Sequence, residues 1–224
     1  MTSIVLIDDH PLFRRGLSQM FAESGDHEVV GQAAEGALGV DLVTRLEPDF
    51  VLLDLHMPGM TGLQVMEALN RAQVKSQIIV LTAELDRVEL VAALRLGAEG
   101  FLLKDTDPDA LLEYVRACHR GTAVLNENLV GLLAEQRHGE PPNRAVQERL
   151  AMLTERETQT LTLLAHGLSN KLIARDLDIS EGTVKVYVKS LMRKLKMRSR
   201  LELATWVHQA AARPSKQGGG DELH

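Results

Sequence analysis

The stretch FVLLDLHMPGM at residues 50–60 decides the fold, because an unbroken apolar run ends there in a carboxylate followed by a turn. Apolar runs at residues 4–7, 78–81 and 101–103 likewise end directly in polar residues. Such runs, separated by helix-length segments, are typical of buried strands in a parallel sheet. Together with a shorter run at 28–31, which we expect near an edge, they predict a five-stranded, doubly wound parallel α/β domain.

The residues that follow these runs are candidates for a single site: Asp8 and Asp9, Asp54, Thr82 and Lys104. The carboxyl ends of the strands in such a sheet line one crevice, so we expect these side chains to meet. Three converging carboxylates repel one another, and a hard divalent cation with a preference for oxygen, Mg²⁺, resolves the repulsion. A metal, a lysine and a hydroxyl around one carboxylate are suited to hold a phosphoryl group.

Each of these residues also has an ordinary structural explanation when it is taken alone. Asp8 and Asp9 are equally suited to cap the helix that follows them. Thr82 fits a strand end, and Lys104 fits a solvated surface. The joint pattern, with a polar residue after each of four apolar runs, favours the site.

Charge divides the chain into two unlike parts. Residues 1–150 carry 13 Lys and Arg against 23 Asp and Glu, a net charge of −10, whereas residues 151–213 carry 11 against 6, a net charge of +5. Only the second part is therefore expected to meet a polyanion. The lone Cys118, the lack of a charged leader and the lack of a membrane-length apolar stretch predict a soluble, cytoplasmic protein.

The sequence predicts four segments. They are an α/β domain at 1–121, a linker with a helix of its own (126–136) at 122–150, an all-α domain of four helices at 151–212, and a disordered tail at 213–224. In the all-α domain we expect helices at about 155–165, 169–177, 181–196 and 199–211.

The second and third of these helices meet in a tight turn that is typical of a helix-turn-helix. Ser180 is placed to cap the third helix, and apolar residues at spacings of three and four turn one face of it to the core. Lys185, Val186 and Lys189 occupy another face, the part of a recognition helix that reaches base edges. Candidates to neutralise DNA phosphates are Arg193, Lys194, Lys196, Arg198 and Arg200. The alternative for the basic stripe is a charged, solvated face on a small bundle.

The segments at 7–11, 53–59, 81–83 and 100–105 resemble the receiver domain of bacterial two-component response regulators. The resemblance implies that Asp54 accepts a phosphoryl group from a sensor histidine kinase. It implies that Lys104 and Thr82 bind that group and that Phe101 is the aromatic switch residue. It also implies a Mg²⁺ ion held by Asp9, Asp54 and the backbone carbonyl of His56, with Asp8 acting through water. Asp105 stands where many receivers have a proline after a cis bond, so the geometry of that bond stays open.

The basic part looks like a LuxR-type helix-turn-helix domain, and the two parts together resemble the NarL/FixJ class, most closely the nitrate/nitrite response regulators. The resemblance implies binding to double-stranded DNA and contact with RNA polymerase, without any enzymatic activity of its own. It also implies a homodimer when the protein is phosphorylated or bound to DNA, with contacts around Leu201, Thr205 and Trp206.

Two other functions compete with this interpretation. An enzyme with an aspartyl-phosphate intermediate typically carries a second aspartate two residues after the nucleophile, but His56 stands there. A receiver that acts through protein or RNA contacts is disfavoured by the basic helix-turn-helix, which suits duplex grooves. We also expect the acidic domain to dock on the basic one and cover the recognition helix and the last helix until Asp54 is phosphorylated.

Overall fold

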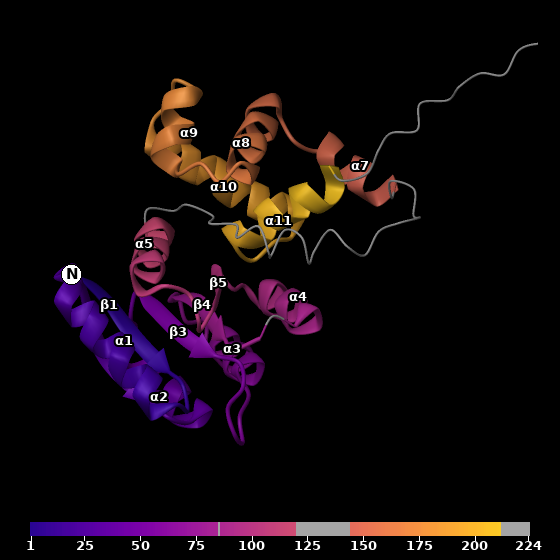
Figure 1. Cartoon of the computed structure of the whole chain (residues 1–224). Coiled ribbons are helices and arrows are strands. Elements are labelled where there is room, and N and C mark those ends of the chain that lie inside the picture. Colours follow the sequence, from indigo (N-terminus) through magenta and orange to yellow (C-terminus); the bar gives the residue numbers. More distant parts are fainter. Residues whose placement is uncertain (85, 120–143, 212–224) are drawn as a thin grey trace, which may run out of the picture.

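The computed structural model describes residues 1–84, 86–119 and 144–211. Strands and helices alternate through the N-terminal domain, as the apolar runs predict (Figure 1). The strands are β1 (Thr2–Ile7), β2 (His27–Ala33), β3 (Phe50–Asp54), β4 (Gln77–Thr82) and β5 (Gly100–Leu103). The helices are α1 (Pro11–Ser24), α2 (Gly36–Leu46), α3 (Gly62–Arg71), α4 (Arg87–Leu96) and α5 (Pro108–His119).

The five strands form one parallel sheet in the order β2-β1-β3-β4-β5, so the short second run is an edge strand, as expected. The register pairs Ile7 with Leu53, Asp54 with Leu81, and Thr82 with Leu103. Four strands therefore end side by side. The residues that follow them in the sequence are brought to one edge of the sheet, where ligands bind in open α/β sheets.

Helices cover both faces of the sheet and close two apolar clusters. Residues of α2, α3 and α4 pack on one face around Val51 and Leu53. Residues of α1 and α5 pack on the other around Phe50 and Leu52. Successive residues of β3 point to opposite faces and are all buried, which explains why the run is apolar throughout rather than alternating.

The C-terminal domain is helical: α7 (Arg144–Ala151), α8 (Glu155–Ala165), α9 (Asn170–Asp176), α10 (Glu181–Leu195) and α11 (Arg200–Ala211). Ser180 caps α10 by accepting a hydrogen bond from the Thr183 N–H, as predicted. Val184, Leu191 and Leu195 are buried, which confirms the predicted core face of this helix. The opposite face of α10 is exposed to solvent.

The sequence misjudged parts of the segment between the domains. Helix α7 forms within residues expected to be linker. The expected helix at 126–136, the polar stretch at 137–143 and the tail at 213–224 lie outside the described residues. None of the helices in the described ranges is long and apolar enough to cross a membrane.

The two domains touch where α11 begins. Figure 1 shows α11 on the side of the helical domain that faces the sheet domain, with α4 and β5 nearby. Leu201, near the start of α11, is 1% exposed and joins the apolar cluster of the N-terminal domain together with Leu90 and Ala98.

Candidate functional site

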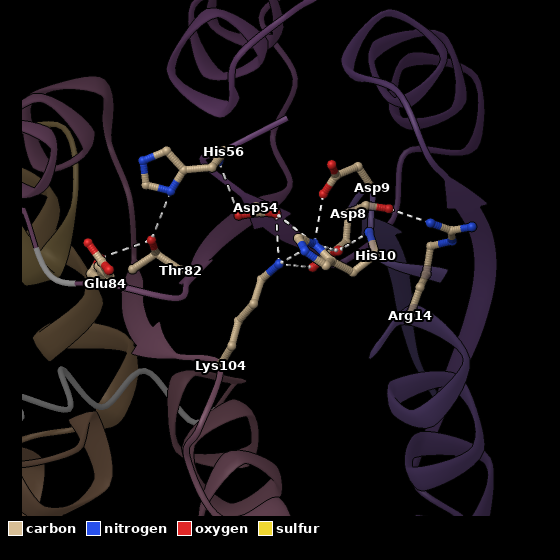
Figure 2. Close-up of polar contacts among 9 residues, drawn as sticks. All are labelled: Asp8, Asp9, His10, Arg14, Asp54, His56, Thr82, Glu84 and Lys104. Atoms are coloured by element: carbon tan, nitrogen blue, oxygen red, sulfur yellow. Dashed lines mark hydrogen bonds and ion pairs between the residues drawn. The ribbon is translucent and has the colours of Figure 1, made fainter. Parts of the chain in front are cut away.

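The strand ends bring the predicted acidic residues together. Asp8 follows β1 and is 3% exposed, and Asp54 is the last residue of β3 and is 1% exposed. Lys104 follows β5 and reaches across to both carboxylates (Figure 2). Residues up to 96 positions apart in the chain are thus adjacent because parallel strands end at a common edge.

Lys104 supplies the positive charge within this group. Its Nζ lies 2.7 Å from Oδ2 of Asp54 and 2.8 Å from Oδ2 of Asp8. Burial alone lowers the pKa of Lys104, but the hydrogen bonds and charges of these two carboxylates outweigh it, so that the pKa is raised above its ordinary value. The ammonium group also lies 5.1 Å from the centre of the Phe13 ring. Lys104 is therefore held as a cation against the buried end of Asp54.

Oxygen atoms suited to a hard metal ion gather beside this lysine. One ligand atom each from Asp8, Asp9, His10 and Asp54 lies within 4.8 Å of the others. Nδ1 of His10 is 2.8 Å from a carboxylate oxygen of Asp9, and the ring remains largely exposed. The carboxylates of Asp9 and Asp54 form a donor set that fits Mg²⁺, which prefers oxygen ligands and one or two carboxylates per protein site, and Asp8 lies close enough to act through water. A single lysine only partly balances their charge, which also favours a cation.

The loop after Asp54 folds tightly around the carboxylate. The backbone N–H of His56 donates to Oδ1 of Asp54 at 3.1 Å. Gly62, the first residue of α3, packs so closely that a Cβ there would overlap the backbone carbonyl oxygen of Asp54. Thr61 caps α3 through a reciprocal box with Gln64. The tight turn and the helix start together fix the direction in which Asp54 points.

Thr82, the last residue of β4, is buried next to this loop. Its hydroxyl donates to the backbone carbonyl of Glu84 at 3.0 Å and lies 3.4 Å from Nδ1 of His56. Nε2 of the same imidazole lies 3.0 Å from Glu89 in α4. Figure 2 shows the Thr82 hydroxyl between Glu84 and His56. The imidazole thus links the acceptor loop, the end of β4 and the first turn of α4.

Phe101, the residue implied as the aromatic switch, lies in the interior of the receiver. It is 1% exposed and packed in the core. Its backbone N–H donates to the hydroxyl of Tyr114 at 3.2 Å. The ring fills the apolar layer between the sheet and α4.

The face of α10 that was predicted to read DNA is open. Lys185, Val186, Lys189 and Arg193 are exposed, and Val186 is 64% exposed although it is apolar. The expectation that the docked N-terminal domain covers the recognition helix is therefore wrong for this arrangement. The domains meet at α11, the last helix, which was also expected to be covered.

Three of the predicted phosphate contacts have other surroundings. Arg200 is 7% exposed and donates to Asn170 and to the carbonyl of Leu168, so the expected phosphate contact is wrong for it. Nζ of Lys194 lies 2.7 Å from Glu157 and 3.1 Å from the carbonyl of Met152, so this lysine joins α10 to the start of α8. Arg198 is exposed, and its Cβ lies 3.4 Å from where a Cβ on Gly97 would be. Lys194 is thus engaged inside the domain, whereas Arg198 stands at the domain boundary.

The residues expected to make dimer contacts are mostly covered in this structure. Leu201 is 1% exposed against the N-terminal domain, and Thr205 is 4% exposed. Trp206 is half-buried against the core of the helical domain. A second chain could reach Leu201 only after the two domains separate.

The sequence missed the residues that join the domains and those that link Thr82 to α4. Glu99, Ser199 and Arg200 meet across the boundary, and Glu89 reaches His56. No sequence pattern marks these residues, because each contact depends on how separately folded elements are placed. The charge difference between the two halves of the chain was the only signal that they would touch.

Comparison with known families agrees with the geometry in both domains. Residues 4–116 match the response regulator receiver domain, and residues 151–207 match the bacterial regulatory proteins of the luxR family. The first range contains the acidic group, Thr82 and Lys104. The second contains α8, α9 and α10 with the exposed basic face.

Similar proteins span nearly the whole chain. The nitrate/nitrite response regulator NarL of Escherichia coli K12 is 45% identical over 208 residues, which are 92% of this chain and 95% of that protein. NarP of the same organism is 45% identical over 88% of this chain and 90% of its own length. RcsB of Salmonella typhimurium superposes with a TM-score of 0.57 at 26% identity over 92% of this chain and 99% of its own. An RcsB–DNA complex superposes with a TM-score of 0.55 at 25% identity over 93% and 98%. The chain belongs to the response regulators that join a receiver domain to a LuxR-type DNA-binding domain and regulate transcription.

Proposed function

We propose that Asp54 accepts a phosphoryl group from the phosphohistidine of a sensor histidine kinase and that this modification controls how the chain engages promoter DNA. The observation that carries the proposal is the position of the Asp54 carboxylate, which is 1% exposed yet lies 2.7 Å from the ammonium group of Lys104 at the open edge of the sheet. A nucleophile beside a fixed cation suits phosphoryl transfer, which depends on positioning and charge stabilisation.

The neighbouring residues take defined roles in this proposal. Lys104 pairs with an oxygen of the incoming group, and the Thr82 hydroxyl exchanges its bond to Glu84 for one to that group. Asp9, Asp54 and the backbone carbonyl of His56 would hold Mg²⁺, with Asp8 acting through water. The ion would neutralise charge that develops on the phosphoryl oxygens.

The test is chemical labelling with acetyl phosphate and Mg²⁺. We expect one alkali-labile phosphoryl group per chain, its loss in Asp54→Asn, and no labelling when the metal is chelated. Asp49→Asn is the matched control, because Asp49 lies at the opposite end of β3 and is exposed. Labelling that persists in Asp54→Asn would contradict the assignment of the acceptor.

We infer that α10 enters the major groove and that Lys185, Val186 and Lys189 contact base edges, while Arg193 and Arg198 contact phosphates. All five are exposed in the described structure. Lys185→Ala and Lys189→Ala should each weaken specific binding by about 1–3 kcal/mol. Arg198→Ala should weaken binding to all duplexes and reduce the salt slope by about 1. Equal losses on specific and scrambled duplexes for Lys185→Ala would remove its base-reading role.

The wider role follows from the relatives. We propose that the chain responds to nitrate or nitrite through its sensor kinase, acts with RNA polymerase in the cytoplasm, has no enzymatic turnover of its own, and pairs through α11 when active. We assign the receiver to 1–121, the linker to 122–150, the DNA-binding domain to 151–212 and a tail to 213–224. Phosphotransfer from candidate kinases, compared at short reaction times, would identify the partner: the cognate kinase should label Asp54 much faster than the others.

A further inference from the structure

The imidazole of His10 lies among the carboxylates of the acidic group, although the proposed cation site does not use it as a ligand. Its Nδ1 atom lies 2.8 Å from Oδ1 of Asp9, 3.4 Å from Oδ1 of Asp8 and 3.9 Å from Oδ2 of Asp54 (Figure 2). Two ligand atoms that each lie about 2.1 Å from one ion are at most about 4.2 Å apart. Each of the three distances is within that span, so one ion can contact Nδ1 together with a carboxylate oxygen.

The lone pair of this nitrogen points into the acidic group. Nζ of Lys104 lies 3.3 Å from Nδ1 of His10, and an ammonium group can only donate, so Nδ1 is the acceptor. The contact with Asp9 is different, because its buried Oδ1 atom has no hydrogen-bond partner among the described residues. Oδ2 of Asp8, on a side chain that is 4% exposed, lacks a well-directed hydrogen bond too and has its ion pair with Lys104. A nitrogen lone pair and carboxylate oxygens that face one another without a shared proton repel unless a cation lies between them.

The helix that begins here does not require the ring. His10 stands at the N-cap position of α1, but its side chain makes no capping hydrogen bond, and Pro11 starts the helix. The side chain of His10 is 65% exposed. The imidazole is therefore neither a cap nor part of the apolar core, and neither role explains its position.

We propose that Nδ1 of His10 is a further ligand of the cation at Asp9 and Asp54, and that the receiver consequently takes Zn²⁺ or Co²⁺ in preference to Mg²⁺. Carboxylate oxygens favour hard ions such as Mg²⁺, whereas an imidazole nitrogen favours transition metals. Two carboxylates and one imidazole also form a set of three protein ligands, with which Zn²⁺ keeps a fourth position open. The inference rests on the proposed cation site, and it makes the acceptor chemistry depend on the supply of transition metal as well as on the kinase.

Calorimetric titration of the full chain with Zn²⁺ and with Mg²⁺ tests this preference. We expect His10→Leu to raise the dissociation constant of the Zn²⁺ ion that competes with Mg²⁺ at least about 10-fold, and to leave the constant for Mg²⁺ within about 2-fold. His166→Leu is the matched control, because it removes an exposed imidazole from the helical domain, and it should change neither constant. Equal Zn²⁺ affinity in the wild-type protein and in His10→Leu would overturn the proposal.

His10→Asn is a second variant, in case leucine disturbs the start of α1. Asparagine is a favoured N-cap residue and replaces the imidazole nitrogen with an amide oxygen. The variant should therefore keep its affinity for Mg²⁺ and still lose about 10-fold in affinity for Zn²⁺. Zn²⁺ affinity that is retained in both variants would show that the carboxylates alone hold the ion.

Proton magnetic resonance of the Co²⁺ form identifies the ligand directly. The ring protons of a Co²⁺-bound imidazole shift far outside their ordinary range, and we expect one such set, lost in His10→Leu and kept in His166→Leu. Absence of shifted ring protons when Co²⁺ occupies the site that Mg²⁺ competes for would also overturn the proposal. These measurements involve no phosphoryl transfer. If acetyl phosphate fails to label Asp54 while the metal results hold, the proposed acceptor role fails and the His10 ligand stands.

Discussion

The ammonium group of Lys104 lies 2.7 Å from Asp54, whose carboxylate is almost completely withdrawn from solvent. The same nitrogen lies 2.8 Å from Asp8. This lysine thus places a positive charge beside two buried carboxylates that would otherwise repel each other. We therefore expect Lys104→Met to lower the free energy of unfolding of the receiver by about 1–3 kcal/mol, less than for a fully buried pair because Lys104 is partly exposed.

Magnesium should reverse much of that loss. A cation at 100 times its dissociation constant stabilises a folded protein by about 2.7 kcal/mol, and Lys104→Met should bind it more tightly than the wild-type protein does. Urea unfolding followed by circular dichroism, with and without Mg²⁺, measures both effects. Equal Mg²⁺ stabilisation in an Asp8→Asn, Asp9→Asn double variant would show that the ion acts elsewhere.

Gly62 tests how the acceptor is positioned. A methyl group there would overlap the Asp54 carbonyl and would lie 2.7 Å from Cα of Leu55, so the loop must shift. We expect Gly62→Ala to destabilise the receiver by about 1–3 kcal/mol and to slow labelling of Asp54 by acetyl phosphate. Gly16→Ala is the control: it lies within α1 with open space around it, and should stabilise the chain by about 0.5–1 kcal/mol. Unchanged labelling in Gly62→Ala would show that the loop tolerates displacement.

The pair Glu157–Lys194 should govern the acid stability of the helical domain. Despite the cost of burial, hydrogen bonds from Lys194, the Thr154 backbone and Ser190 lower the pKa of Glu157 to about 2. Because the pKa of Glu157 is lower in the folded state, the ionised carboxylate stabilises the domain at pH values above the ordinary pKa of 4.5. This contribution to stability is lost as the pH falls from 4.5 through about 2. Glu157→Gln should thus cost about 2–3 kcal/mol at pH 7 and flatten the acid transition. Trp206, the chain's single tryptophan, reports on this domain alone.

Lys194→Met separates a structural role from a DNA contact. We expect it to lower stability by an amount similar to Glu157→Gln, and to leave the salt slope of DNA binding unchanged. Arg193→Ala, one residue earlier and exposed, is the matched variant and should reduce the slope by about 1. A reduced slope in Lys194→Met would restore the phosphate contact expected from the sequence.

Docking of the two domains should weaken as the pH rises. Burial raises the pKa of Glu99 to about 7, although the N–H groups of Arg200 and Leu201 and the charge of Arg200 act in the opposite direction. Because the pKa of Glu99 is raised in the docked state, Glu99 contributes fully to the stability of docking at pH values below about 4.5. This contribution is lost as the pH rises through about 7. Protection factors at the two amides, corrected for intrinsic exchange, should fall between pH 6 and pH 8.

The other charged groups around Glu99 do not reverse this direction. Burial also raises the pKa of Glu202, which acts with the same sign, although the charges of Arg198 and of Arg95 on α4 oppose this shift. Burial lowers the pKa of Arg200 to about 10, still above the range tested. Glu99→Gln should abolish the pH dependence and Glu202→Gln should only reduce it. A dependence that survives in Glu99→Gln would assign the titration to another group.

The strands, their order and the acidic group were predictable because strong local patterns determined them. Four apolar runs ended in polar residues, and the rule for parallel sheets placed those ends together. The helix-turn-helix was equally predictable, from the capping residue Ser180 and from the spacing of the apolar residues in α10. In each case the information lies within a few neighbouring residues.

The errors concern side chains whose partners are set by packing between elements. Lys194 looks like a DNA contact in the sequence, and only the approach of α8 to α10 reveals Glu157 as its partner. The receiver was expected to cover both α10 and α11. That the contact forms at α11 while α10 stays exposed depends on contacts at Ala98 and Glu99, which no local pattern encodes.

Strand β5 also bears on how such a protein can diversify. Lys104 lies directly after this strand and Glu99 directly before it, so five residue steps of extended chain, roughly 16 Å, separate the lysine that contacts the acceptor from the domain boundary. Strand β5 is short and hydrogen-bonded along β4, so it cannot stretch or bend to absorb a displacement at either end. Substitutions that alter only the packing of β5 against β4 would therefore change the level of phosphorylation at which the protein responds. They would leave both the phosphoryl chemistry and the promoter preference intact, so sensitivity can evolve separately from specificity.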